Sequence, residues 1–239
     1  MIRLILVVLF LVLFFIFSIP VFLILYFIGL KNMTLRHRIS IALVRFAFHV
    51  VLFLSGVKVI VKGLENIPDD KPVLYVANHS GFFDILAGYT TVKGLCGFVS
   101  KAELKKVPFL RLWMYFVNCL FFNRKDMRAA MQMIIDGIEK LKEGISIFIF
   151  PEGTRSKDGK LKPFKEGSFK MALKADVPII PTAITGTSAV FEDHLPCIKS
   201  NVVTITYGTP ILPADYTKTE QKHIGEIAQK EIAKMLGQA

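Results

Sequence analysis

The sequence predicts an α/β fold: a largely buried mixed β-sheet flanked by helices and preceded by N-terminal membrane helices. Two observations support this prediction. From residue 57 onward, short β-branched and aromatic runs alternate with longer stretches of helical periodicity, which is typical of a sheet covered by helices. Before residue 57, apolar residues run almost without interruption and contribute much of the 53% hydrophobic content.

The uncharged segment 4–30 comes first. As a helix it would be about 40 Å long, more than the roughly 30 Å of a bilayer core. It is too long for the apolar region of a secretory signal, and no small-residue cleavage site follows, so we expect it to be retained. Pro20 lies inside it and predicts a kink or a break.

A second apolar segment, 39–54, carries Arg45 and His49 one helical turn apart, on one face of an amphipathic helix. Either 4–30 spans the bilayer once, or the two segments form a helical pair embedded in one leaflet. The pair is favoured, because Arg45 would be costly at bilayer depth. We therefore expect residues 1–56 to be membrane-anchoring helices and residues 57–239 to form the α/β domain.

Within the α/β domain the elements alternate. Strands are predicted at 57–61, 73–77, 116–122, 145–150, 179–184 and 202–207. Helices are predicted at 85–89, 127–142, 169–174 and 219–236. Residues 69–72 form a turn, and no internal repeat or low-complexity linker interrupts the pattern.

The charge balance indicates an anionic partner. Lys and Arg number 30 against 19 Asp and Glu, which gives a net charge of +11. The excess is spread along the chain, so an acidic membrane and a phosphorylated lipid are favoured over nucleic acid. Lys31, Arg36 and Arg38 suit the anionic cytoplasmic face of a cell inner membrane or plasma membrane.

The cysteines are Cys96, Cys119 and Cys197. Their odd number and wide spacing argue against a disulfide framework and against a metal site, and suit a reducing compartment. We expect them to be small buried apolar residues.

The strand predicted at 73–77 leads into Asn78-His79-Ser80-Gly81-Phe82-Phe83-Asp84. On one continuous helix His79 and Asp84 would point about 140° apart, but at a strand-to-helix turn they can meet. An aspartate bonded to one imidazole nitrogen leaves the other free as a base, so this pair can deprotonate a hydroxyl. Alternatively, His79 caps a helix and Asp84 belongs to its first turn. The position after a buried strand favours the catalytic interpretation.

Cationic loops follow further apolar runs. One is Phe150-Pro151-Glu152-Gly153-Thr154-Arg155-Ser156. Gly153 allows close backbone approach, and the planar guanidinium of Arg155 suits phosphate. Lys101 and Arg124 follow two more such runs. Each loop alone could be a solvated polar turn, but a base and three cationic loops at strand ends are harder to dismiss together.

Four motifs occur in order: Asn78-His79-x4-Asp84, Phe122-Asn123-Arg124, Phe150-Pro151-Glu152-Gly153-Thr154-Arg155-Ser156 and Val177-Pro178-Ile179-Ile180-Pro181. This series resembles the glycerolipid acyltransferase family, and within it most closely the bacterial 1-acyl-glycerol-3-phosphate acyltransferases. The resemblance covers about residues 57–211, and the first and third motifs together are highly specific.

The resemblance implies transfer of a fatty acyl group from acyl-CoA or acyl-[acyl carrier protein] to the sn-2 hydroxyl of lysophosphatidic acid, forming phosphatidic acid. His79 would be the general base and Asp84 its orienting partner. The acceptor site would comprise Lys101, Arg124, Glu152, Gly153, Thr154 and Arg155, with Lys101, Arg124 and Arg155 on the phosphate. Residues 177–181 would line the acyl chain or belong to the core. No cofactor or metal is implied.

Other functions stay open at this point. A related acyltransferase that uses glycerol 3-phosphate or another lysophospholipid would share these motifs. A catalytically silent membrane protein that binds acidic lipid should have lost His79, Asp84 or Arg155, and all three are present. A lipid hydrolase is less favoured, since water would have to replace a bound acceptor. A covalent acyl-enzyme through Ser80 is also less favoured, because no Gly-x-Ser-x-Gly motif occurs.

Overall fold

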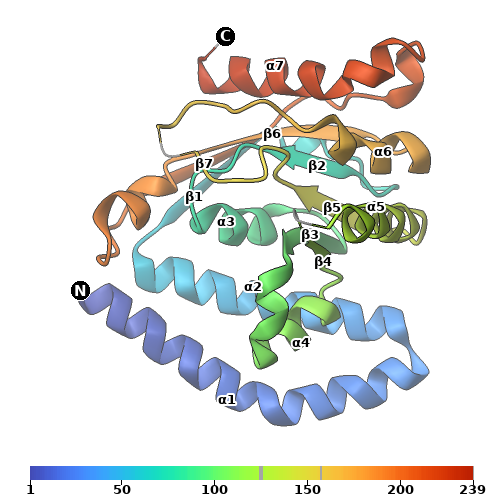
Figure 1. The fold of residues 1–239 in the computed structure, drawn as a ribbon. Coiled ribbons are helices and arrows are strands. Elements are labelled where there is room, and N and C mark those ends of the chain that lie inside the picture. Colours follow the sequence, from blue (N-terminus) through green and yellow to red (C-terminus); the bar gives the residue numbers. More distant parts are fainter. Residues whose placement is uncertain (124–125, 157, 239) are drawn as a thin grey trace.

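The structure is a computed structural model that describes residues 1–123, 126–156 and 158–238. Within these ranges, seven strands form one sheet in the order β1-β7-β6-β2-β5-β3-β4 (Figure 1). The strands are β1 (Lys58–Lys62), β2 (Leu74–Ala77), β3 (Cys96–Lys101), β4 (Leu120–Phe122), β5 (Ser146–Ile149), β6 (Ile179–Thr185) and β7 (Val202–Tyr207). Neighbouring strands are parallel except β6 and β7, which are antiparallel, so the sheet is mixed.

Helices cover both faces of the sheet, which explains why its central strands are apolar on both sides. One face packs against α5 (Met127–Lys142), α6 (Lys170–Ala175) and α7 (Ile224–Leu236). The other face packs against α3 (Phe83–Thr91), with α2 (Met33–Ser55), α4 (Pro108–Phe116) and α1 (Ile2–Lys31) beyond it (Figure 1). The described connections include the 3-10 turns η1 (Leu64–Asn66), η2 (Ala102–Lys106), η3 (Glu166–Phe169), η4 (Ser188–Val190), η5 (Glu192–His194), η6 (Pro213–Asp215) and η7 (Glu220–His223).

The predicted fold class is confirmed, and α5 has the predicted bounds. The pattern misses β3 and α4, and it assigns 116–122 to one strand. In the structure α4 ends at Phe116, Asn118 adopts a positive φ of 59°, and β4 begins only at Leu120. Continuous apolar runs do not distinguish a buried helix from a buried strand by periodicity, which explains this error. The helix predicted from 219 begins at Ile224, after η7.

Helices α1 and α2 form an antiparallel pair (Figure 1). Helix α1 continues through Pro20, so the predicted alternative of a break is wrong, and the helix is bent (Figure 1). Among the described residues, these two helices are long and apolar enough to cross a membrane. One contact of the pair with the rest of the molecule is made by Trp113 of α4, whose indole Nε1–H donates to Ser18 Oγ of α1 at 2.9 Å.

Arg45 contacts protein and ties α2 to the α/β domain. Its Nε donates to the carbonyl oxygen of Tyr89 at 3.0 Å, and its Nη2 donates to those of Val92 at 2.7 Å and Gly94 at 3.0 Å. These carbonyls lie at and just beyond the end of α3, where a helix has unpaired acceptors and partial negative charge. Arg36 likewise lies over the ring of Phe116, 4.9 Å from its centroid.

Candidate active site

The candidate site lies at one edge of the sheet. Strands β2, β5, β3 and β4 are neighbours and parallel, so their carboxyl ends meet at this edge. The first motif follows β2 and the Glu-Gly-Thr-Arg loop follows β5. Lys101 is the last residue of β3. The sheet order thus brings together loops that are far apart in the sequence.

His79 and Asp84 meet as the turn chemistry predicts. His79 Nδ1 lies 2.7 Å from Asp84 Oδ2, and the backbone N–H groups of Ser80 and Gly81 donate to the same oxygen at 2.7 and 2.9 Å. Thr187 Oγ1 donates to Asp84 Oδ1 at 2.5 Å. The Asp84 side chain is fully buried. Since an ionised carboxylate only accepts, Nδ1 carries the proton, and Nε2 of His79 is left as a base.

Phe150 and Ser156 also contact His79 and restrict its position. Its ring stacks on Phe150, with centroids 4.2 Å apart and an interplanar angle of 20°. Its carbonyl oxygen accepts from Ser156 N–H at 2.7 Å. The side chain is 18% exposed, so the ring is fixed by protein and still reachable by a substrate.

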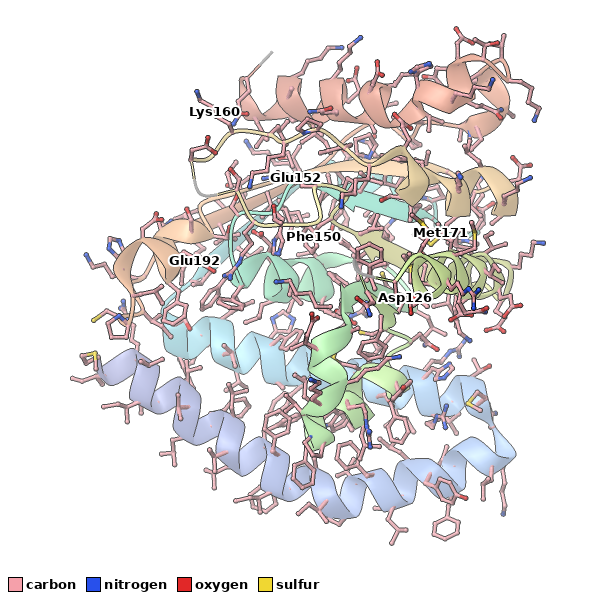
Figure 2. All side chains as sticks on the ribbon, viewed as in Figure 1. Asp126, Phe150, Glu152, Lys160, Met171 and Glu192 are labelled. Atoms are coloured by element: carbon pink, nitrogen blue, oxygen red, sulfur yellow. The ribbon has the colours of Figure 1, made fainter. Side chains whose placement is uncertain are left out.

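Glu152 is a buried residue of the loop after β5, close to Phe150 (Figure 2). Its Oε1 accepts from His79 N–H at 2.9 Å and its Oε2 accepts from Lys162 N–H at 3.2 Å. Burial raises the pKa of the Glu152 carboxyl, and the two N–H groups oppose that shift. Glu152 therefore joins the loop after β5 to the loop that carries His79.

A cavity of about 340 Å³ opens beside His79. Its polar and cationic wall includes Lys101, Thr154, Arg155 and Lys165. The rest of the lining is mainly apolar and includes Phe82, Ile85, Phe98, Val99, Leu104, Phe122, Met133, Ile149 and Phe150. A base, several cations and an apolar surface therefore share one pocket. This combination suits a phosphorylated ligand that also carries a hydrocarbon chain.

Comparison with known proteins identifies the chain at the level of family. A family model described as Acyltransferase matches residues 58–185, more than half of the 239-residue chain. The chain belongs to this acyltransferase family. The resemblance expected from the motifs is thereby confirmed.

Relatives with curated names are similar to this acyltransferase over most or part of their length. The 1-acyl-sn-glycerol-3-phosphate acyltransferase of Borreliella burgdorferi is 32% identical over 83% of this chain and 80% of its own. The chloroplastic 1-acyl-sn-glycerol-3-phosphate acyltransferase BAT2 of Brassica napus is 38% identical over 54% of this chain, but only 38% of that relative is covered.

A solved structure resembles the acyltransferase along nearly its whole length. The crystal structure of the 1-acyl-sn-glycerophosphate (LPA) acyltransferase PlsC from Thermotoga maritima has a TM-score of 0.74 and 27% sequence identity. The match covers 98% of this chain and 97% of that chain. The N-terminal helices are therefore included in the similarity.

The structure shows which of the site residues predicted from the sequence line the pocket of the acyltransferase and which do not. His79, Lys101, Gly153, Thr154 and Arg155 line the pocket. Asp84 and Glu152 lie behind it as hydrogen-bond acceptors, and Arg124 lies outside the described residues. Residues 179–181 of the fourth motif are in β6 and are buried in the sheet, which agrees with the alternative that this stretch belongs to the core.

Sequence reasoning misses several residues around the site. Lys162 donates from Nζ to Thr154 Oγ1 at 3.2 Å and to the carbonyl oxygen of Arg155 at 2.9 Å, so it supports the loop after β5. Glu192 pairs with Arg155. The only sequence signal for Lys162 is its place in a basic stretch near the motif, and no local pattern singles out Glu192.

The cysteines are free, and Cys96 and Cys119 are buried. Burial raises the pKa of both of these thiols, which makes them poor nucleophiles at neutral pH. Among the described residues, no group of three or more His, Cys, Asp or Glu side chains is arranged to hold a metal ion.

Proposed function

We propose that the protein is a 1-acylglycerol-3-phosphate O-acyltransferase. It transfers a fatty acyl group from acyl-CoA or acyl-[acyl carrier protein] to the sn-2 hydroxyl of lysophosphatidic acid and forms phosphatidic acid. The observation that carries the proposal is that His79, oriented by Asp84, lines the same pocket as Lys101 and Arg155. The names and coverage of the bacterial relative and the solved structure support it.

His79 acts as the base in direct transfer. Nε2 takes the proton of the acceptor hydroxyl. At the same time the hydroxyl oxygen attacks the carbonyl carbon of the thioester, and a tetrahedral oxyanion forms. When the oxyanion collapses, the carbon–sulfur bond breaks, and the departing sulfur receives the proton from Nε2. The Asp84 carboxylate holds the tautomer and stabilises the imidazolium between these two proton transfers. Base catalysis of this kind contributes about 10²–10⁴-fold.

The acceptor phosphate binds at the cationic wall. Arg155 supplies a planar guanidinium and Lys101 a point charge, and we assign Arg124 to the same role. Gly153, with a positive φ of 67°, lets the loop approach the ligand, and Thr154 contributes a hydroxyl. The apolar lining receives hydrocarbon. Glu152 serves this acceptor site indirectly, because it fixes the loop that presents these groups relative to His79.

Residues 1–56 anchor the enzyme at an anionic membrane surface, and residues 57–239 form the acyltransferase domain on the cytoplasmic face. The exposed apolar side chains of α1 suit the hydrocarbon region, and they include Phe17, Leu23, Phe27 and Leu30. Lys31 and Arg38 are exposed near the α1–α2 turn, where they suit acidic headgroups. An anchored active site meets its lipid acceptor without extracting it into water.

The test is an acylation assay with purified protein in anionic vesicles. Radiolabelled acyl-CoA and acyl-[acyl carrier protein] are each supplied with lysophosphatidic acid, and the products are resolved by lipid chromatography. We expect labelled phosphatidic acid from wild type and none above background from His79→Ala. Glycerol 3-phosphate and other lysophospholipids are added as competitors. Preferential acylation of one of them would assign the enzyme to that acceptor, and no acylation at all would refute the proposal.

A further inference from the structure

A carboxylate outside the family motifs lies against the acceptor-binding arginine. Glu192 belongs to η5, after β6, and its side chain is 17% exposed. Its Oε1 accepts from Arg155 Nη1 at 2.9 Å and from the backbone N–H of Phe82 at 2.7 Å. One oxygen of Glu192 thus bonds the loop after β5 and the start of α3 at the same time.

The surroundings leave this carboxylate little freedom. Its Oε2 is buried and has no hydrogen-bond partner within the described part of the chain. It packs against Gly81, where an added Cβ would lie 2.7 Å from this oxygen. A desolvated carboxylate with one unbonded oxygen is costly unless a cation compensates for it, and Arg155 is that cation. The arrangement is therefore favourable only while the guanidinium stays in place.

The guanidinium is held on a second side. Arg155 Cζ lies 4.1 Å from the centroid of the Phe82 ring, a cation–π geometry. The Arg155 side chain is still 38% exposed and lines the pocket. A guanidinium carries five N–H donors, so the bond to Glu192 leaves donors for a ligand phosphate.

We infer that Glu192 is a positioning residue for the acceptor: it holds Arg155 against Phe82, on the loop that carries His79. This inference rests on the proposed function. Phosphate bound by Arg155 places the acceptor hydroxyl at His79 only if the two side chains keep a constant separation. The hydrogen bonds of Glu192 to Arg155 and Phe82, together with the stacking of Arg155 on Phe82, keep the separation of Arg155 and His79 constant. An arginine free to change rotamer would have to be ordered when the phosphate binds, so it would hold the acceptor more weakly and present the hydroxyl at His79 less often.

Two substitutions separate the hydrogen bonds from the charge. Glu192→Ala removes both bonds, and kcat/KM for lysophosphatidic acid should fall by about tenfold, the effect of losing the charge-assisted bond to Arg155. Glu192→Gln keeps an oxygen that can accept from both donors, so it should recover most of that loss. Asp193→Ala is the matched control, because it removes an exposed carboxylate from the same turn.

The kinetic test measures kcat and KM for acceptor and donor separately. Glu192→Ala is expected to raise the acceptor KM and to leave the donor KM near the wild-type value. In an Arg155→Ala background it should have little further effect, because the side chain that it positions is gone. Equal changes in both KM values, or full additivity with Arg155→Ala, would overturn the inference.

A second measurement does not depend on turnover. The rate at which phenylglyoxal modifies Arg155, followed by peptide mass spectrometry, should rise in Glu192→Ala and stay close to wild type in Glu192→Gln and Asp193→Ala. Equal rates in all four proteins would overturn the pairing. If wild type acylates no lysophosphatidic acid, the proposed function fails, and these rates still report on Glu192. If Arg155→Ala impairs acceptor use and Glu192→Ala does not, only the positioning role fails.

Discussion

Asp84→Asn tests how the buried carboxylate serves His79. In the structure Oδ2 accepts three N–H groups, and Oδ1 accepts the hydroxyl of Thr187. An asparagine offers one acceptor oxygen and one NH₂ donor. The three N–H groups select the oxygen at the Oδ2 position, and the NH₂ turns to the Thr187 hydroxyl, which can accept as well as donate. The amide should therefore still accept from Nδ1–H and keep the catalytic tautomer.

The expected loss follows from the charge alone. A hydrogen bond to a charged group contributes about 1.5–3 kcal/mol and a neutral one about 0.5–1.5 kcal/mol, so the imidazolium loses about 1.5 kcal/mol of stabilisation. With about 1.4 kcal/mol per factor of ten, kcat should fall by about tenfold. A change to the wrong tautomer of His79 would instead lower kcat by about 10⁴-fold. The two mechanisms therefore differ by about three orders of magnitude.

The assay is the initial rate of phosphatidic acid formation with both substrates saturating, and thermal unfolding shows that the variant is folded. Thr187→Val is the control, because it removes the hydroxyl from the other oxygen and leaves the charge and the bond to His79. Its kcat should stay close to that of wild type. A loss of about 10⁴-fold in Asp84→Asn would show that the backbone N–H groups do not fix the amide and would refute this reasoning.

Other substitutions test the remaining contacts. Arg155→Lys keeps the charge but loses the planar fork, so the acceptor KM should rise by about tenfold and the donor KM little; equal rises would argue against phosphate binding. Glu152→Gln places a buried side-chain NH₂ against a backbone N–H, so denaturant titration should show a free energy of unfolding lower by about 1–3 kcal/mol, and unchanged stability would contradict the bonding described. Arg45→Met leaves three carbonyl oxygens without their donor, so the free energy of unfolding in detergent should fall by about 1–3 kcal/mol. Arg38→Met, at an exposed position, is the control and should leave it unchanged. Equal losses of stability in the two variants would count against the docking role of Arg45.

The elements that the sequence predicts well are those with a complete local signal. Helix α5 combines amphipathic periodicity with a capping residue, and Asp126 accepts from Arg128 and Ala129 N–H at its start. Strand β3 and helix α4 lack such a signal, since β3 contains Gly97 and α4 is a short aromatic-rich stretch after Pro108. Where local preferences are weak, tertiary packing selects the conformation.

The two N-terminal helices show a similar division. The sequence predicts two apolar helices and a kink or a break at Pro20, because charge, length and proline have local consequences. Because a charged Arg45 would be costly at bilayer depth, the sequence favours a helical pair in one leaflet. In the structure the Arg45 side chain donates to carbonyl oxygens at the end of α3. Which surface a charged side chain faces depends on the element packed against it, and that element lies more than forty residues away.

The amino-acid sequence is sufficient to predict that His79 can meet Asp84 across one turn, that cationic loops follow several strands, and which family the chain belongs to. These features are local, because each depends on a few consecutive residues and their backbone preferences. The contacts of Glu152 with backbone behind the pocket, and of Glu192 with Arg155, are visible in the folded structure and have no signal in the sequence. Those contacts join loops after different strands, and they form because the order of strands in the sheet brings the loops together, which no local propensity encodes.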